Sequence, residues 1–162
     1  PIVGMPVVYV KIGDHYYHGL CDVGASVSAI PYTLYKEIMN DIAPAEIEDI
    51  DVTIKLANRD TISPIGIVRD VEVLCGKIKY PSGFLVIGSP QDDFCPIIFG
   101  RPFLNTFNAR IDYEKEIVAV SFGDLSRDFN FSKFHRQPRD KESPSKDEII
   151  GLASIACLLL IR

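Results

Sequence analysis

The chain has 162 residues, of which 47% are hydrophobic and 24% charged, and it carries a net charge of -5. This length and composition indicate one globular domain with a single sizeable core and room for a short appendage. The acidic balance lacks the basic footprint of a nucleic-acid binder, so we expect no nucleic-acid partner for this domain.

The four cysteines, Cys21, Cys75, Cys95 and Cys157, are widely spaced and form no C-x-x-C pair. This pattern favours reduced core thiols over a disulfide-rich secreted scaffold. The N-terminus shows no charged-then-apolar signal segment, so we expect an intracellular protein, cytoplasmic or nuclear. The start at Pro1, without Met, indicates a fragment of something longer.

The first elements form a predicted hairpin. Residues 5–12 alternate and are rich in Val and Tyr, as in a strand, and Gly13-Asp14 is a turn signal. Residues 16–21 return as a second strand that delivers Asp22 to its end. A carboxylate after a buried run loses hydration, so it either shapes a turn or serves a site that needs an acid.

A short helix is predicted at 31–39. Pro suits the first helical position, and Leu34 and Ile38 lie four residues apart on one face. An acidic loop follows at 41–51.

The middle of the chain reads as short strands separated by turn residues. The turns are the polar "ANRD" at 57–60 and a Gly-containing hairpin at 75–77, and "SPQDD" at 89–93 is a loop. The predicted strands are 52–56, 71–74, 78–80 and 84–87.

The next apolar run, 95–100, is predicted to be a strand ending at Gly100, and 101–107 opens a short helix. Residues 109–122 close with a hairpin around 113–116. Many short strands with only two short helices indicate an all-β barrel or sandwich.

We expect the character of the chain to change after residue 124. Residues 125–162 read as a charged linker followed by an apolar segment at 149–161. That segment is shorter than the ~18–20 residues that span a bilayer, so a docking helix is favoured and a membrane association is not.

Two motifs carry a resemblance to a known family. "LCDVGASVSAIP" at 20–31 and "IIFGRPFL" at 97–104 together resemble the retropepsin-like aspartic proteases, specifically those of plant gypsy-type retrotransposon polyproteins. The resemblance covers about residues 5–124, and the stretch between the motifs is similar to the family's flap hairpin. It implies an all-β, retropepsin-like closed barrel with one or two short helices, and an active site at a homodimer axis.

The resemblance also implies roles for individual residues. Asp22 would be the catalytic acid, one from each subunit, acting on a peptide or polyprotein substrate without a cofactor. The implied substrate-binding residues are Gly24, Ala25 and Ser26, with Ala57, Asn58, Arg59 and Asp60 at the flap tip. The implied structural supports of the site are Val23, Gly100 and Arg101.

One residue departs from the family pattern and leaves a second reading open. Val23 stands where Thr or Ser usually follows the Asp, so the hydroxyl that bonds across the dimer axis is missing. The alternative is therefore a retropepsin fold with little or no proteolysis, serving as a dimerisation or protein-binding module.

The sequence supports two other functions, a metal site and a Ser or Cys hydrolase, less well. In "HYYHGLC" the alternation of a strand puts His18 and Cys21 on opposite faces, which disfavours a metal site. Ser26 and Ser28 lack a G-x-S-x-G setting, and Cys21 lacks a recognisable histidine partner, which disfavours a Ser or Cys hydrolase.

Overall fold

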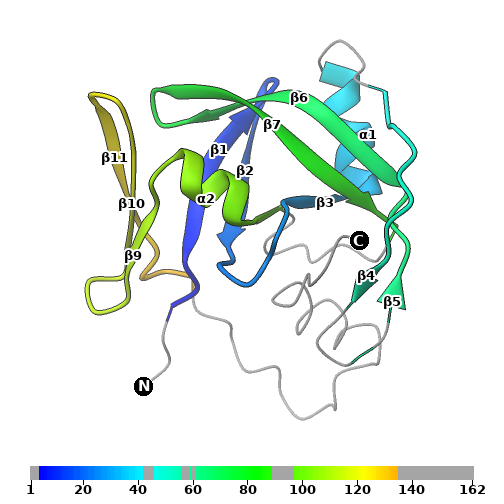
Figure 1. The fold of residues 1–162 in the computed structure, drawn as a ribbon. Helices are drawn as coiled ribbons and strands as arrows, with labels where there is room; N and C mark the ends of the chain where they lie inside the picture. The colour runs from blue at the N-terminus through cyan, green and yellow to red at the C-terminus, as the bar shows by residue number, and fades with distance from the viewer. Residues whose placement is uncertain (1–3, 42–45, 56–58, 60, 89–96, 135–162) are drawn as a thin grey trace.

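The computed structural model describes residues 4–41, 46–55, 59, 61–88 and 97–134. Its centre is a closed barrel of six strands in the order β1-β2-β8-β3-β7-β6 (Figure 1). These strands are β1 (Val7–Ile12), β2 (His15–Cys21), β3 (Ala29–Pro31), β6 (Gly66–Cys75), β7 (Ile78–Ile87) and β8 (Ile97–Phe99). The predicted closed barrel is confirmed.

The first hairpin forms as predicted. β1 and β2 pair antiparallel in a continuous register from Val7 opposite Leu20 to Ile12 opposite His15. Alternate side chains of β1 enter the core, and Gly13 takes a positive φ of 60° in the tight turn. β2 ends at Cys21, and Asp22 is therefore the first residue after the strand.

The strand β3 was not predicted, and it changes the role of Pro31. Pro31 ends β3, and the helix α1 (Tyr32–Asp41) begins one residue later than expected. β3 runs parallel to β7 and touches β8 antiparallel at Ala29, so it closes the barrel. Leu34 and Ile38 are buried, as their spacing predicts.

The hairpin of β6 and β7 is longer than the sequence indicates. The predicted break at 81–83 is absent, because β7 runs through Pro81, Ser82 and Gly83 while pairing with β6. A bulge between Val68 and Val71 shifts the register, and Asp70 within it has a φ of 56°. Turn-forming residues were misread here because cross-strand pairing overrides local preference.

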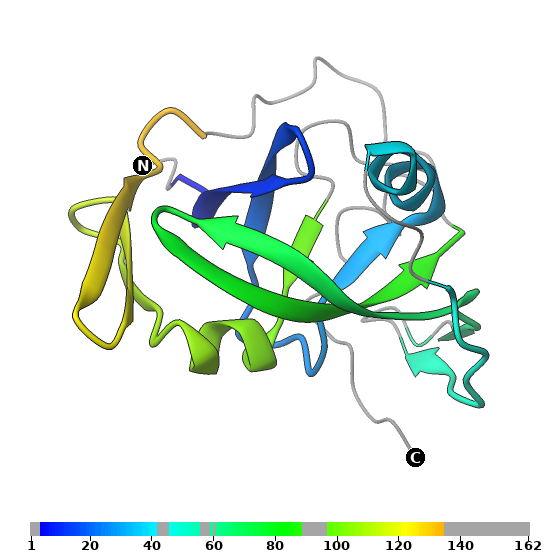
Figure 2. The same ribbon diagram turned by 90° about the horizontal axis from the view of Figure 1, so that it is seen from above.

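A second, three-stranded sheet stands beside the barrel, at the end opposite α1 (Figures 1 and 2). It follows the short helix α2 (Arg101–Thr106), which was predicted. Its strands are β9 (Arg110–Asp112), β10 (Ile117–Phe122) and β11 (Leu125–Asn130).

The strand β11 corrects the expectation that the linker starts at 125. Residues 125–130 pair with β10 along their whole length. Phe129 and Phe131 are buried in the core, and the Met5 N–H donates to the Phe134 carbonyl at 2.8 Å. The folded unit therefore reaches residue 134, and the apolar segment 149–161 lies outside the described residues.

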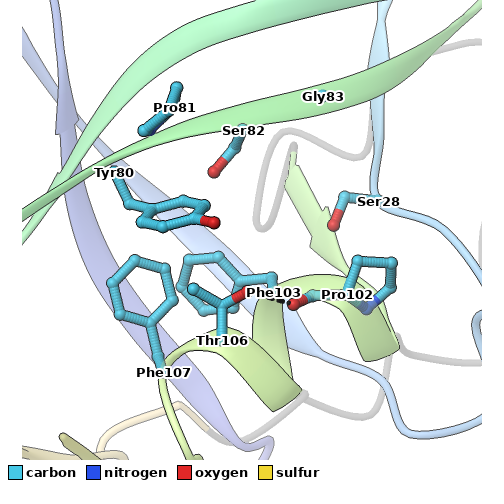
Figure 3. Close-up of a pocket in the computed structure, with 9 residues that line it drawn as sticks. All are labelled: Ser28, Tyr80, Pro81, Ser82, Gly83, Pro102, Phe103, Thr106 and Phe107. Carbon is cyan, nitrogen blue, oxygen red and sulfur yellow. Dashed lines mark hydrogen bonds between the residues drawn. The ribbon is translucent and has the colours of Figure 1, made fainter. Parts of the chain in front are cut away.

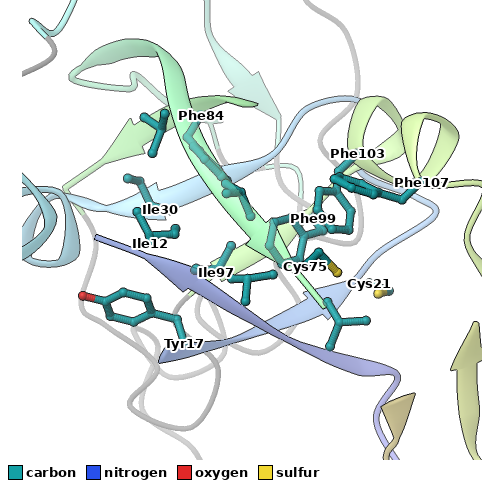
Figure 4. Close-up of a cluster of buried hydrophobic side chains, with 14 of the residues drawn as sticks. Ile12, Tyr17, Cys21, Ile30, Cys75, Phe84, Ile97, Phe99, Phe103 and Phe107 are labelled. Atoms are coloured by element: carbon teal, nitrogen blue, oxygen red, sulfur yellow. The ribbon is translucent and has the colours of Figure 1, made fainter. Parts of the chain in front are cut away.

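The main core fills the barrel and extends under α2 (Figure 4). Phe99 and Phe103 stack with ring centroids 3.7 Å apart, and Phe107 packs on Phe103 at 4.4 Å. Cys21 and Cys75 are buried, and burial raises the pKa of Cys75 to about 12. Both behave as small apolar groups here, as predicted for core cysteines.

Among the described residues, no helix combines the length and apolar character needed to cross a bilayer.

Candidate active site

Asp22 lies at the point where β2 leaves the barrel. β2 and β8 are parallel neighbours there, with Cys21 opposite Phe99. The Asp22 N–H donates to the Phe99 carbonyl at 2.9 Å, which fixes the backbone of the acid to the end of β8. The two sequence motifs are therefore adjacent in space.

Burial and hydrogen bonding act in opposite directions on the Asp22 carboxyl. Its Oδ1 accepts the Gly24 N–H at 2.9 Å. Loss of hydration raises the pKa of the carboxyl, while the backbone N–H groups of Gly24 and Ala25 lower it. Desolvation is the larger effect, so the pKa of Asp22 stands above its ordinary value. Such a shift, in a loop held by backbone bonds, is a feature of catalytic acids.

The turn at Gly100 packs directly beneath the Asp22 loop. The Arg101 N–H donates to the Ala25 carbonyl at 2.9 Å, and the Gly100 N–H donates to Ser28 Oγ at 3.0 Å. A Cβ on Gly100 would lie 2.4 Å from the Val27 carbonyl oxygen, so no other residue fits there. Gly100 thus allows the turn to pack closely against the Asp22 loop.

Arg101 supports the loop through its backbone more than through its charge. Its guanidinium Nη1 is exposed and lies 3.5 Å from the Val23 carbonyl oxygen, a long contact compared with the 2.9 Å backbone bond to Ala25. The support implied for Arg101 therefore comes mainly from its backbone.

The three loop residues implied to bind substrate differ in exposure. Gly24 and Ser26 are partly exposed, whereas Ala25 is fully buried and its carbonyl is used by Arg101. The expectation that Ala25 lines a cleft is therefore corrected, because its side chain belongs to the core. Val23 is 67% exposed on the same loop.

The hairpin expected to act as a flap forms from β4 (Ile54–Lys55) and β5 (Thr61–Ile62), which pair antiparallel. Of the expected tip residues, Arg59 is exposed with a φ of 70°, while Ala57, Asn58 and Asp60 lie outside the described residues. Ile54 is buried in the apolar cluster that contains Ala25. The base of the hairpin therefore packs against the loop that carries Asp22.

Solved structures share this architecture. The retroviral protease-like domain of Ddi1 from Leishmania major superposes with a TM-score of 0.53 and 18% identity, over 73% of this chain and 88% of that one. EIAV protease in complex with the inhibitor HBY-793 superposes with a TM-score of 0.53 and 18% identity, over 67% and 92% of the two chains. No family model and no curated protein sequence matches the chain. It has a retropepsin-like fold.

Within this retropepsin-like fold, Ser28 is a site residue that the sequence reading missed. Among the described residues, Ser28 and Tyr17 are the buried ones whose side chains carry a hydroxyl, amide or charged group. The available signal was a serine directly before the apolar residues that become β3, where a buried polar side chain needs a partner. The partner, Gly100, lies 72 residues away, so the sequence alone does not show it.

A small open hollow of about 220 Å³ lies between β7 and α2 of the retropepsin-like barrel (Figure 3). Tyr80 and Phe107 line one end and Ser28 and Pro102 the other. None of the residues predicted from the sequence for the catalytic site lines it, so it is separate from the Asp22 carboxyl.

His18 of the second strand packs against aromatic rings. The ring of His18 packs between those of Tyr9 and Phe134, with centroids 4.8 and 4.9 Å away, and this burial lowers its pKa. In the part of the chain that the structure describes, no cluster of three or more His, Cys, Asp or Glu is placed to hold an ion.

Proposed function

We propose that this chain is an aspartic endopeptidase of retropepsin type, in which Asp22 residues from two subunits form the catalytic dyad. The observation that carries the proposal is the desolvated Asp22 carboxyl, held on Gly24 at the junction of the two motif loops. The described residues contain one such acid loop, so a dyad needs a second copy of the chain.

The chemistry follows from two carboxyls at close range. Like charges about 3 Å apart do not both ionise readily, so the pair holds one proton and titrates as a unit. The ionised member takes a proton from a water, whose oxygen attacks the peptide carbonyl carbon. The protonated member gives its proton to the carbonyl oxygen. The carbon–nitrogen bond then breaks as the carboxyl that took the water proton gives it to the leaving nitrogen, and the other carboxylate takes a hydroxyl proton from the tetrahedral intermediate, which leaves one proton on the pair.

The remaining site residues have supporting roles in this proposal. Gly24 and Ser26 face the substrate backbone, and the hairpin tip at 57–60 closes over an extended peptide and excludes water. Val23 contacts its counterpart across the dimer axis. Its 67% exposure in the single chain is consistent with a partner that covers it.

The same proposal includes an origin in a plant gypsy-type retrotransposon polyprotein, which rests on the two sequence motifs. The substrates would then be the junctions of that polyprotein. Assays of cleavage at candidate junction peptides, compared with scrambled peptides, test this part separately.

A specific observation favours the second candidate, a dimerising or protein-binding module with little proteolysis. Val23 supplies no hydroxyl at the dyad, so the two acids are held less firmly than in the family pattern. Pepstatin-sensitive cleavage of a peptide library supports the enzyme, and a stable dimer without cleavage supports the module.

The decisive experiment is Asp22→Asn in a peptide-library assay from acid to neutral pH. The amide keeps the shape and the acceptor for Gly24 but cannot exchange the proton, so cleavage should fall at least about a hundredfold. The matched control is Asp128→Asn, an exposed acid on β11, which should cleave at the wild-type rate. Wild-type cleavage by Asp22→Asn, with deamidation excluded, contradicts the proposal.

A further inference from the structure

Ser28 connects three parts of the molecule that are distant in sequence. Its side chain is only 4% exposed, and its Oγ accepts the buried Gly100 N–H at 3.0 Å. Its carbonyl oxygen accepts the Leu85 N–H of β7 at 2.9 Å. One residue thus joins the end of the Asp22 loop to the Gly100 turn and to the barrel wall.

The Gly100 N–H donates to Ser28 Oγ within a closely packed turn. Gly100 is buried, and a Cβ there would lie 2.5 Å from the Val27 carbonyl carbon and 2.9 Å from the Ala25 oxygen. A buried donor that loses its acceptor is costly, so the turn must shift to recover one. Without the Ser28 hydroxyl, the simplest recovery is movement of the turn away from the Asp22 loop toward water.

That movement would reach the carboxyl through two short backbone bonds. Phe99, directly before Gly100, accepts from the Asp22 N–H at 2.9 Å, and Arg101, directly after it, donates to Ala25 at 2.9 Å. Gly100, which donates to Ser28, stands between Phe99 and Arg101 in the chain, so the Ser28 bond is flanked by these two contacts. A shift of Gly100 therefore displaces two backbone bonds that hold the acid loop, one at Asp22 and one at Ala25.

We propose that Ser28 is a positioning residue for Asp22, acting through the Gly100 N–H to hold the turn before α2 against the acid loop. Ser28 itself touches neither substrate nor the reacting atoms. The inference rests on the proposed function for its catalytic consequence, and on the contacts alone for its effect on the carboxyl.

Three substitutions at Ser28 test this role. Ser28→Ala removes the acceptor, and Ser28→Thr keeps it, with the hollow beside Ser28 offering space for the added methyl group (Figure 3). Ser28→Cys, which has a similar shape and a weaker acceptor, replaces Ser28→Ala if that variant does not fold. The matched control is Ser82→Ala, which removes a hydroxyl from the facing wall of the same hollow.

Peptide cleavage gives the first readout, at equal dimer content across the pH range. In Ser28→Ala, kcat should fall about ten- to a hundredfold with KM within about twofold, because small displacements of a reacting group carry losses of this size. Ser28→Thr should restore most of kcat, and Ser82→Ala should match wild type. Wild-type kcat in a folded Ser28→Ala dimer, or no rescue by Thr, overturns the inference.

The second readout does not depend on cleavage, and it separates this inference from the proposed function. Titration of the Asp22 carboxyl followed by NMR should show its pKa moving toward the ordinary value in Ser28→Ala and returning in Ser28→Thr. Faster exchange of the Gly100 amide should accompany the shift. If wild type cleaves nothing, the proposed function fails, while an unchanged Asp22 titration in Ser28→Ala overturns the positioning role.

Discussion

At the scale of single residues, Asp22 is held in an environment that penalises its charge. Two backbone N–H groups favour the carboxylate, but the loss of hydration outweighs them and raises the pKa. A folded-state pKa above the unfolded value means that the folded chain binds the proton more tightly. The neutral carboxyl therefore favours folding below the unfolded pKa, and this contribution is lost as pH rises through the folded pKa.

This sign gives a stability prediction for Asp22→Asn in dilute, monomeric protein. The amide keeps an oxygen for the Gly24 N–H and never ionises, so it avoids the cost that wild type meets above its unfolded pKa of 3.8. The melting temperature of the variant should be close to that of wild type at about pH 3. It should exceed the wild-type value by a growing margin as the pH rises toward about 6. Thermal melts by circular dichroism measure the difference.

The control for this prediction is Asp14→Asn, at an exposed turn between β1 and β2. Its melting temperature relative to wild type should not follow the trend of Asp22→Asn. A difference for Asp22→Asn that is flat with pH, or that shrinks as pH rises, would show that backbone hydrogen bonding outweighs desolvation at this carboxyl.

The sequence predicted the acid itself but not all of the residues that pack around it. Asp22 and Gly100 could be located because each follows an apolar run that ends a strand. Ala25 was misassigned and Ser28 was missed for the same reason. Which side of a loop is buried depends on the residues that pack against it. For the Asp22 loop these belong to the cluster around Ile54, which is tens of residues away in the sequence.

At the scale of elements, β11 shows how composition misled the prediction. Its sequence "LSRDFN" is polar at every position except its first and fifth, and five of its six residues are exposed. Such a strand contributes through its pairing with β10 and through two aromatic rings, not through an apolar stripe. Charged composition indicates disorder only where no neighbour offers pairing.

This leads to a truncation prediction. A chain ending at 124 loses β11 together with Phe129 and Phe131, which are 3% and 0% exposed. Removing one buried Phe side chain costs about 3–5 kcal/mol, so losing two approaches a typical total stability of about 5–15 kcal/mol. The shortened chain should lose its cooperative thermal transition, as measured by calorimetry.

The matched control ends at 134, where the Phe134 carbonyl still accepts the Met5 N–H. This chain should keep a cooperative transition, because every described contact of β11 remains. Equal transitions in the two shortened chains would mean that β11 adds nothing to the core. Loss of the transition in both would assign a structural role to residues beyond 134.

At the scale of the whole molecule, the barrel unites the two motif loops at one place. The parallel pairing of β2 with β8 brings residues near 22 and near 100 together, and β3 then closes the barrel between β8 and β7. The sequence indicated the all-β class through strand density and turn spacing. It did not indicate β3, because three apolar residues ahead of a helix carry no strand period of their own.

The exposure of Val23 allows the dimer to be tested without disturbing the single chain. Its side chain is 67% exposed and makes no core contact that Thr would lose, so Val23→Thr should change monomer stability by less than about 0.5 kcal/mol. In the proposed dimer, the new hydroxyl bonds across the axis once per subunit. At about 0.5–1.5 kcal/mol each, the pair should tighten the dimer by about 1–3 kcal/mol, or about five- to a hundredfold.

Sedimentation equilibrium and peptide cleavage over a dilution series measure this effect together. Because the proposed dyad needs both chains, specific activity of wild type should fall on dilution, and Val23→Thr should hold its activity to lower concentration. Val23→Ala is the matched control, since it shortens the side chain without adding a donor. Weaker dimers in Val23→Thr than in wild type would mean that the axis is packed around an aliphatic side chain, since a buried hydroxyl without an acceptor costs about 1–3 kcal/mol.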